Sequence, residues 1–138
     1  GYIAMMLYFD RRFLETFHLS LHDFSGFIFD AGQPTTHFNV LKERGIDPRR
    51  VVIDEAAPIF HVADYNSEPP VLMIVSDHDM ENRLEQTQLL LSTMKCFGYP
   101  KETVVFQLMK NSSHCSYLGQ PVFVYMIADF IEYKFKKE

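Results

Sequence analysis

The chain has 138 residues and a mass of 16.2 kDa, and 47% of its residues are apolar and 14% aromatic. This content is enough for the hydrophobic core of one domain and excludes a disordered chain. Thirteen basic and eighteen acidic residues give a formal net charge of −5, and the basic residues are scattered, so we expect no nucleic-acid partner. No apolar run approaches the roughly 20 residues that cross a bilayer, so we expect a soluble chain without a membrane span.

The first part of the chain predicts one helix and one strand. A nearly continuous apolar run from Tyr2 to Phe9, which resumes with Phe13 and Phe17, indicates a helix buried on most sides, with Phe13 in the core. Because such a helix is too apolar to face water, we expect a separate N-terminal half to cover it. Residues 24–29 are rich in aromatic and β-branched side chains and indicate a buried strand.

Residues 33–70 are irregular and interrupted by prolines, which indicates a cap or insertion rather than a layer of the sheet. Within them, residues 38–44 predict a short helix, and the Asp-Pro pair at residues 47–48 fits the start of another. The arginine pair at residues 49–50 is typical of solvated charges, and it could also meet an anionic group of a substrate.

Order returns in the second half of the chain. Residues 71–75 and 103–108 indicate strands, and residues 81–97 and 121–135 indicate helices. This alternation predicts the α/β class, with parallel strands joined by right-handed crossovers. Three strands are few for a complete domain of this class, so we expect one edge of the sheet to be left uncovered.

The residue types that bind metals do not predict a metal or cofactor site. Cys96 and Cys115 lack the paired spacing of zinc ligands, and the helical pattern around Cys96 is typical of a buried thiol. The pattern does not support a disulfide between them, which favours a reducing compartment and a cytoplasmic location. His78 lies between Asp77 and Asp79, but three adjacent side chains in a turn cannot all face one ion without backbone strain.

An acid and an imidazole follow two consecutive predicted strands. Residues 71–75 lead into Asp77 and Asp79, and residues 103–108 lead toward His114. Since the carboxyl ends of parallel strands meet at one edge of a sheet, we expect Asp79 to lie close to His114. Such a carboxylate would orient an imidazole that acts as a general base. Asp77 is nearer the strand and is expected to bind turn amides, and a helix-capping role for Asp79 remains the alternative.

Three segments resemble the esterase and lipase type of α/β-hydrolase. Residues 69–79 resemble the family's Pro-apolar-strand-Gly-Asp-x-Asp segment, in which the second Asp is the triad acid, and residues 111–114 resemble its small-residue loop that ends in the catalytic His. Residues 1–4 are similar to the sequence that follows the serine in the family's Gly-x-Ser-x-Gly-Gly turn. The chain departs from the pattern at Ser76, where the family often has Gly, and at Cys115, where a Gly often follows the His.

This resemblance implies a three-layer α/β-hydrolase-type sheet, of which residues 1–138 form only the C-terminal strands and their helices. Residues 33–70 would then be the insertion that helps to form the acyl or alcohol pocket. Asp79 would be the triad acid and His114 the base in the hydrolysis of a small or medium neutral ester, with no metal or organic cofactor. No Gly-x-Ser-x-Gly occurs in the sequence, so the serine and the oxyanion hole would lie upstream, on an N-terminal half of the same fold, and this half alone would be inert.

Two other functions remain open. An amidase, such as a formamidase, or a peptidase of the same fold would use identical machinery, because fold and triad do not choose the acyl group. The second alternative is a non-catalytic α/β module that binds a partner through its first helix and its open sheet edge. A serine within a Gly-x-Ser-x-Gly just upstream of Gly1 would favour the enzyme.

Overall fold

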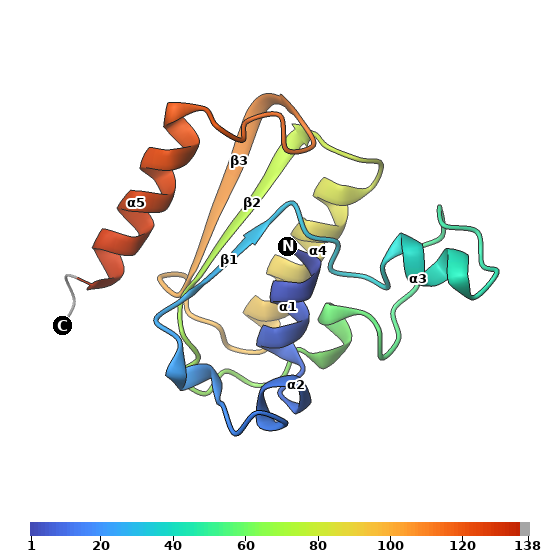
Figure 1. Cartoon of the computed structure of the whole chain (residues 1–138), viewed down its shortest axis with the longest axis horizontal. Coiled ribbons are helices and arrows are strands. Elements are labelled where there is room, and N and C mark those ends of the chain that lie inside the picture. The colour runs from blue at the N-terminus through green and yellow to red at the C-terminus, as the bar shows by residue number, and fades with distance from the viewer. Residues whose placement is uncertain (136–138) are drawn as a thin grey trace.

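The computed structural model describes the backbone of residues 1–135 and the side chains of residues 1–133. Three parallel strands form one sheet, in the order β1 (Phe27–Asp30), β2 (Val71–His78) and β3 (Val104–Ser113), and helices cover both of its faces (Figure 1). The predicted three-layer α/β architecture with parallel strands is therefore confirmed. The central strand β2 is buried at each of its first six residues, as expected for a strand with helices on both sides.

One face of the sheet packs against α1 (Tyr2–Phe9) and α4 (Arg83–Cys96). Alternate strand residues such as Phe29 and Met73 point to this face, because successive side chains of a strand point to opposite sides. Tyr8 joins this core from α1, is 1% exposed, and donates a hydrogen bond from its hydroxyl to the Pro69 carbonyl at 2.9 Å. This bond satisfies the polar end of an otherwise apolar side chain.

The opposite face packs against α5 (Pro121–Phe135), which is separated from α1 and α4 by the sheet (Figure 1). Leu72 and Ile74 of β2 point to this side, and Phe130 of α5 and the fully buried Tyr117 contact them. Much of α5 nevertheless remains uncovered by the described residues. The apolar side chains of α5 that are more than two-fifths exposed are Val122, Val124, Tyr125, Ile131 and Tyr133.

The first helix is shorter than the sequence predicts. It ends at Phe9 because Asp10 takes an extended conformation, with φ −96° and ψ 92°, and a separate short helix α2 (Arg12–Glu15) follows. The prediction that Phe13 packs in the core is wrong: Phe13 is 47% exposed and Phe17 74% exposed. The break at Asp10 changes the direction of the chain, so the two phenylalanines no longer continue the buried face of α1.

The prediction that α1 needs a separate half to cover it is also wrong for most of the helix. Met5, Met6, Tyr8 and Phe9 are all buried by this chain, which packs α1 between β1 and the 3-10 helix η2 (Pro58–His61). The large exposed apolar face belongs to α5 instead. The open edge is found as predicted, because β1 pairs on one side with β2 and forms one edge of the described sheet.

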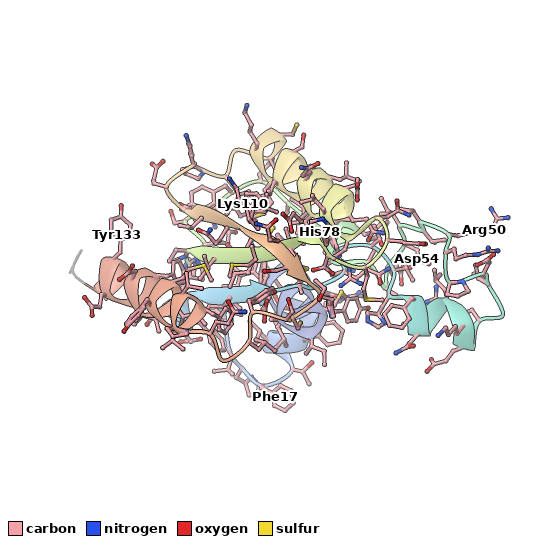
Figure 2. All side chains as sticks on the ribbon, turned by 90° about the horizontal axis from the view of Figure 1, so that it is seen from above. Phe17, Arg50, Asp54, His78, Lys110 and Tyr133 are labelled. Carbon is pink, nitrogen blue, oxygen red and sulfur yellow. The ribbon has the colours of Figure 1, made fainter. Side chains whose placement is uncertain are left out.

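Residues 33–70 contain α3 (Phe38–Glu43) and η2, and none of them forms a strand of the described sheet. The predicted helix start at residues 47–48 is wrong. The Asp47 carboxylate instead accepts a hydrogen bond from the Arg49 backbone N–H at 3.0 Å and pairs with the Arg49 guanidinium, so the chain makes a turn there. Figure 2 shows that this region, marked by Arg50, and Tyr133 of α5 lie at opposite ends of the molecule.

The remaining elements differ from prediction mainly in their limits. β3 continues to Ser113, α4 begins at Arg83, and a 3-10 turn η1 (Leu21–Asp23) precedes β1. The buried face of α4 includes Thr87, Leu90 and Met94, whereas Cys96 is exposed, so the prediction of a buried thiol there is wrong. No helix within residues 1–135 combines the length and the apolar character of a membrane span.

Candidate active site

Polar side chains collect where the three parallel strands end. Asp30 is the last residue of β1, Asp79 follows β2 by one residue, and His114 follows β3 directly. Because the strands are parallel and adjacent, these three residues come to the same edge of the sheet, although up to 84 sequence positions separate them. The structure thus brings together the two candidate residues that the sequence analysis selected, and adds a third carboxylate beside them.

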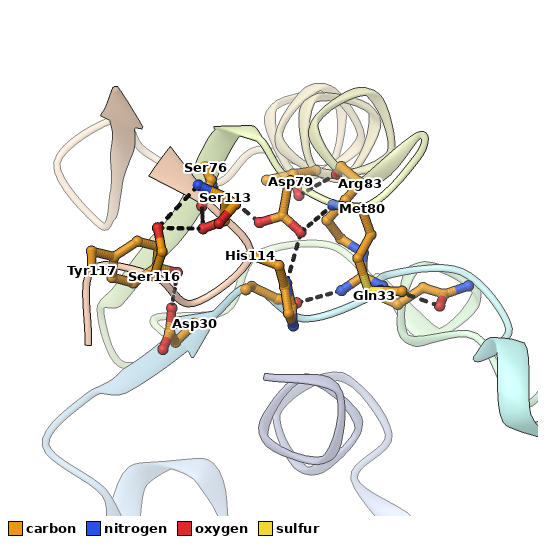
Figure 3. Close-up of polar contacts among 12 residues, drawn as sticks. Asp30, Gln33, Ser76, Asp79, Met80, Arg83, Ser113, His114, Ser116 and Tyr117 are labelled. Carbon is orange, nitrogen blue, oxygen red and sulfur yellow. Dashed lines mark hydrogen bonds and ion pairs between the residues drawn. The ribbon is translucent and has the colours of Figure 1, made fainter. Parts of the chain in front are cut away.

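The Asp79 carboxylate and the His114 imidazole are in direct contact (Figure 3). His114 Nδ1 lies 2.7 Å from Asp79 Oδ1, and the Asp79 side chain is 1% exposed while that of His114 is 40% exposed. Asp79 is held by two further donors, the backbone N–H of Met80 at 2.8 Å and that of Ser76 at 3.3 Å. The carboxylate is therefore fixed in a buried position, and it holds one ring nitrogen while the rest of the ring remains accessible.

Asp77 has a different task, which agrees with the prediction that it binds turn amides. Its carboxylate accepts the backbone N–H of Asn111 at 2.8 Å and that of Ser112 at 3.2 Å. These hydrogen bonds, the first above all, lower the pKa of Asp77 to about 2. They stabilise an irregularity between β2 and β3, where Asp77 alone faces residues 110–112. This bulge sets the position at which His114 leaves β3.

A small network of serines shapes the loop that carries His114. The buried Ser76 donates from its hydroxyl to the Ser113 carbonyl at 2.9 Å, and the Ser116 hydroxyl accepts the Ser113 N–H at 3.0 Å. Directly after His114, Cys115 has a φ of 57°, which is uncommon for a residue with a side chain. A glycine would adopt this angle without strain, so the family's glycine at this position and the present cysteine serve the same sharp turn.

Tyr117 and Asp30 form a second anchor for the same loop, which the sequence analysis missed. The Tyr117 hydroxyl donates to Asp30 Oδ1 at 2.5 Å, across 87 sequence positions. Burial, and then this hydrogen bond to a carboxylate, raise the pKa of Tyr117 far above its usual value, so the hydroxyl remains a donor at any physiological pH. The bond ties the loop after β3 to the end of β1. No local pattern in the sequence relates the two residues.

Arg83 is the other functional candidate that the sequence did not reveal. It is 5% exposed, and its guanidinium donates to the Ala31 carbonyl at 2.5 Å and to Gln33 Oε1 at 3.4 Å. Burial lowers the pKa of Arg83, and the nearby Asp79 carboxylate acts in the opposite direction. An arginine of this kind at the start of α4 resembles an ordinary surface cation in the sequence, so no signal distinguishes it.

His114 opens onto a cavity of about 580 Å³, here called the His114 cavity. The first residues of the chain contribute to its lining, and the His114 ring extends from Asp79 toward the ribbon of α1 (Figure 3). Gly1 packs backbone to backbone against the end of β1: a Cβ on Gly1 would lie 2.4 Å from the Asp30 carbonyl oxygen, and a Cβ on Gly32 2.7 Å from the Gly1 carbonyl carbon. Only glycines permit this approach. The amino end of α1 is therefore fixed beside the imidazole.

The other sequence candidates lie apart from this cavity or carry no cluster. His78 Nδ1 contacts Asp77 Oδ1 at 2.8 Å, but the His78 side chain is 71% exposed. Cys96 and Cys115 are free thiols. Among the residues that the structure describes, no group of three or more His, Cys, Asp and Glu side chains is arranged to hold a metal ion.

The fold and the strand-end site together define the class to which this chain is related. No protein-family model and no curated protein matches the sequence, but solved structures do. They are esterases, and they confirm that the chain has the three-layer fold of part of an α/β-hydrolase. At the sequence identities involved, the likeness concerns the fold.

The particular structures are those of one esterase from the Planctomycetes species Thermogutta terrifontis. Its esterase 2 phosphoramylated by tabun superposes with a TM-score of 0.56 at 16% identity, over 78% of this chain and 40% of that chain. The native enzyme gives a TM-score of 0.54 at 16% identity, over 80% and 41%. The form phosphonylated by sarin gives 0.55 at 15% identity, over 78% and 42%. The chain thus spans about two fifths of the length of the esterase it resembles.

Proposed function

We propose that this chain is the C-terminal part of a serine hydrolase that cleaves small or medium carboxylic esters. The observation that carries the proposal is the contact between the buried Asp79 carboxylate and the partly exposed His114 imidazole, 2.7 Å apart at the ends of adjacent parallel strands. Fold-level likeness to an esterase raises the expectation and does not choose the substrate.

Asp79 and His114 would have separate roles in such a reaction. With Nδ1 held by Asp79, His114 keeps Nε2 for a substrate or a nucleophile in the His114 cavity. In ester hydrolysis, Nε2 would accept the proton of a serine hydroxyl as that oxygen attacks the carbonyl carbon, and would return it to the leaving alcohol. The Asp79 carboxylate would stabilise the imidazolium formed in between. A second cycle with water would release the acid.

The serine in this proposal comes from outside the 138 residues. The amino end of α1 supports this placement, because Gly1 lies in the lining of the His114 cavity and is fixed against Asp30 and Gly32. A serine just upstream would therefore enter beside the imidazole. Backbone N–H groups of the same upstream region would supply the oxyanion hole.

The rest of the fold would also cover two open surfaces. The free edge of β1 can accept a further parallel strand, and the exposed apolar face of α5 can accept a further helix. Residues 33–70 would serve as the cap, since their α3 segment contributes Phe38 to the lining of the His114 cavity. Each of these roles belongs to the same proposal.

The test is the kinetics of the full-length protein with p-nitrophenyl butyrate. A covalent acyl-enzyme predicts a burst of p-nitrophenol equal to the enzyme concentration, followed by steady turnover. His114→Ala is expected to remove both the burst and the turnover. A full-length protein that folds but releases p-nitrophenol no faster than buffer would contradict the proposal.

The same experiment, extended to an amide, addresses the alternative chemistry. The butyryl p-nitroanilide presents the same acyl group with a poorer leaving group. An esterase is expected to favour the ester by several orders of magnitude, whereas an amidase or peptidase would turn over both at measurable rates. The non-catalytic binding module that the sequence leaves open would hydrolyse neither compound.

A further inference from the structure

A second cavity, of about 390 Å³, lies beside the His114 cavity and carries an excess of positive charge. Its cationic lining residues are Lys42, Arg49, Arg50 and Arg83, and we call it the basic cavity. Glu81 is the one carboxylate in its lining. This local balance is opposite in sign to the chain as a whole, whose formal net charge is −5. A concave site of one sign concentrates ligands of the other sign.

Arg83 is the most informative of these cations. Its side chain is 95% buried by the measure that leaves it 5% exposed, and its three hydrogen-bond acceptors are the Ala31 carbonyl, the Gln33 amide oxygen and the Met80 sulfur. All three acceptors are neutral. Buried charges in proteins are usually paired, because an isolated charge in a low-dielectric interior is costly. The Arg83 guanidinium therefore faces the cavity with its charge balanced only at longer range, by Asp79.

The remaining cations form the rim. Lys42 Nζ lies 5.2 Å from the centre of the Phe38 ring, which holds the ammonium group near the cavity wall. Arg49 is paired with Asp47 at 2.6 Å, so its charge is largely offset. Arg50 is exposed, and Figure 2 shows it at the end of the molecule remote from Tyr133. Lys42 and Arg50 are thus the rim charges that an anion could use.

The two cavities are continuous. Gln33, Phe38, Met80 and Arg83 line both of them, so a molecule that reacts at His114 can extend past these side chains into the basic cavity. The shared wall is well ordered in polar terms. Gln33 donates from its side-chain amide to the Thr36 carbonyl at 2.9 Å, and its amide oxygen accepts from the Phe38 N–H at 3.3 Å.

We propose that the basic cavity binds a carboxylate of the substrate, so that the site hydrolyses esters carrying a negative charge away from the scissile carbonyl. This inference rests on the proposed hydrolase function and narrows its substrate class. It differs from the neutral ester that the sequence resemblance implies. Arg83 would meet the carboxylate inside the cavity, and Lys42 and Arg50 would attract it at the entrance.

The test compares matched esters with the full-length protein. Mono-p-nitrophenyl glutarate and p-nitrophenyl valerate have acyl chains of equal length and differ in a terminal carboxylate. The butyrate esters of 4-hydroxybenzoate and 4-hydroxybenzamide place the same difference on the alcohol side. In one of these two pairs, kcat/KM is expected to favour the anion by about tenfold or more. The preference is expected to fall as salt is added, because rim charges are screened.

Variants identify the cavity as the cause. The double variant Lys42→Gln/Arg50→Gln is expected to remove most of the preference and to leave the neutral esters unaffected. Lys101→Gln, which removes an exposed charge beside α4, is the matched control and should change neither rate. Arg83→Met should abolish the preference, with thermal denaturation used to check folding. The rim variant keeps the test valid even if Arg83→Met does not fold.

The outcomes separate this inference from the function on which it rests. Equal or faster turnover of the neutral ester in both pairs would overturn the carboxylate site and leave the hydrolase intact. A preference for the anion that survives the rim variant and the Arg83 variant would also overturn it. Turnover of no ester of either charge would mean that the proposed function itself has failed.

Discussion

The chain contains two contacts between an aspartate and a histidine that are almost equal in length and opposite in environment. His78 lies 2.8 Å from Asp77, with 71% of the histidine side chain and 25% of the aspartate side chain exposed. His114 lies 2.7 Å from Asp79, where the exposed fractions are 40% and 1%. The distance between two side chains therefore says little about what the pair does.

The difference comes from what else holds each carboxylate. Asp77 spends its oxygens on the backbone of residues 111–112 and stabilises the bulge in β3, so His78 is an accessory contact at the surface. Asp79 is fixed by backbone N–H groups on its own side and points across the strand ends to His114. One pair shapes the loop and the other is placed to move a proton. The predictions below separate these two tasks.

The largest expected difference is between the two histidines. His114→Ala should lower kcat of the full-length protein toward p-nitrophenyl butyrate by about 10⁵-fold or more, because no other group would accept the proton of the nucleophile. His78→Ala is the matched control and should change kcat by less than about twofold, as expected for an exposed side chain outside the cavity. Equal losses in the two variants would contradict the assignment.

The two aspartates should differ next. Asp79→Asn should lower kcat by about 10⁴-fold with little change in KM, because an amide cannot stabilise the imidazolium. Asp77→Asn should act mainly on the loop, lowering the urea midpoint of unfolding while retaining most of the activity per folded molecule. Steady-state kinetics and urea unfolding on both variants provide the comparison. An active Asp79→Asn enzyme would remove Asp79 from the proposed triad.

A smaller effect concerns the dependence of stability on pH. The pKa of Asp77 is lowered from 3.8 to about 2 in the folded chain by the N–H groups that it accepts. Its contribution to the free energy of unfolding is therefore fully present above the unfolded pKa and is lost as the pH falls through the folded one. The difference in urea midpoint between the parent and Asp77→Asn should shrink as the pH falls from about 5 toward 2. A difference that is independent of pH would assign the effect of Asp77 to something other than its charge.

The smallest predicted effect is at Ser76. Ser76→Ala removes the hydrogen bond to the Ser113 carbonyl and leaves that oxygen with the Ser116 hydroxyl as its remaining side-chain donor. The free energy of unfolding should fall by about 1 kcal/mol, which is typical for one buried hydrogen bond. Urea unfolding measures this loss. Ser112→Ala, whose hydroxyl bonds only within its own loop, is the control and should cost less.

The pairing of Asp79 with His114 could be predicted because it follows from topology. Both residues come just after strands that the sequence reveals, and parallel strands end at one edge of the sheet. The class of fold and the open edge follow from the same alternation of elements. The bulge that lengthens β3 was not predicted, since it depends on the Asp77 carboxylate binding a backbone 34 positions away.

Other features had no usable signal. The bond between Tyr117 and Asp30 and the burial of Arg83 depend on contacts 87 and 52 positions apart. Cys96 was expected to be buried because the apolar residues of α4 suggested the wrong face. Its buried face includes the polar residues Arg83 and Thr87 and so gives little contrast in the sequence. Phe13 was misplaced because the break at Asp10 owes more to its side-chain bonds with Arg12 than to a helix-breaking residue.

The measurement that tests the central claim most directly is labelling of the full-length protein with a fluorophosphonate, read by mass spectrometry of its peptides. The account predicts one labelled serine in the segment just upstream of Gly1, and a labelling rate that falls by several orders of magnitude in His114→Ala and is unchanged in His78→Ala. The absence of any labelled serine, or labelling that is as fast without His114 as with it, would contradict the account.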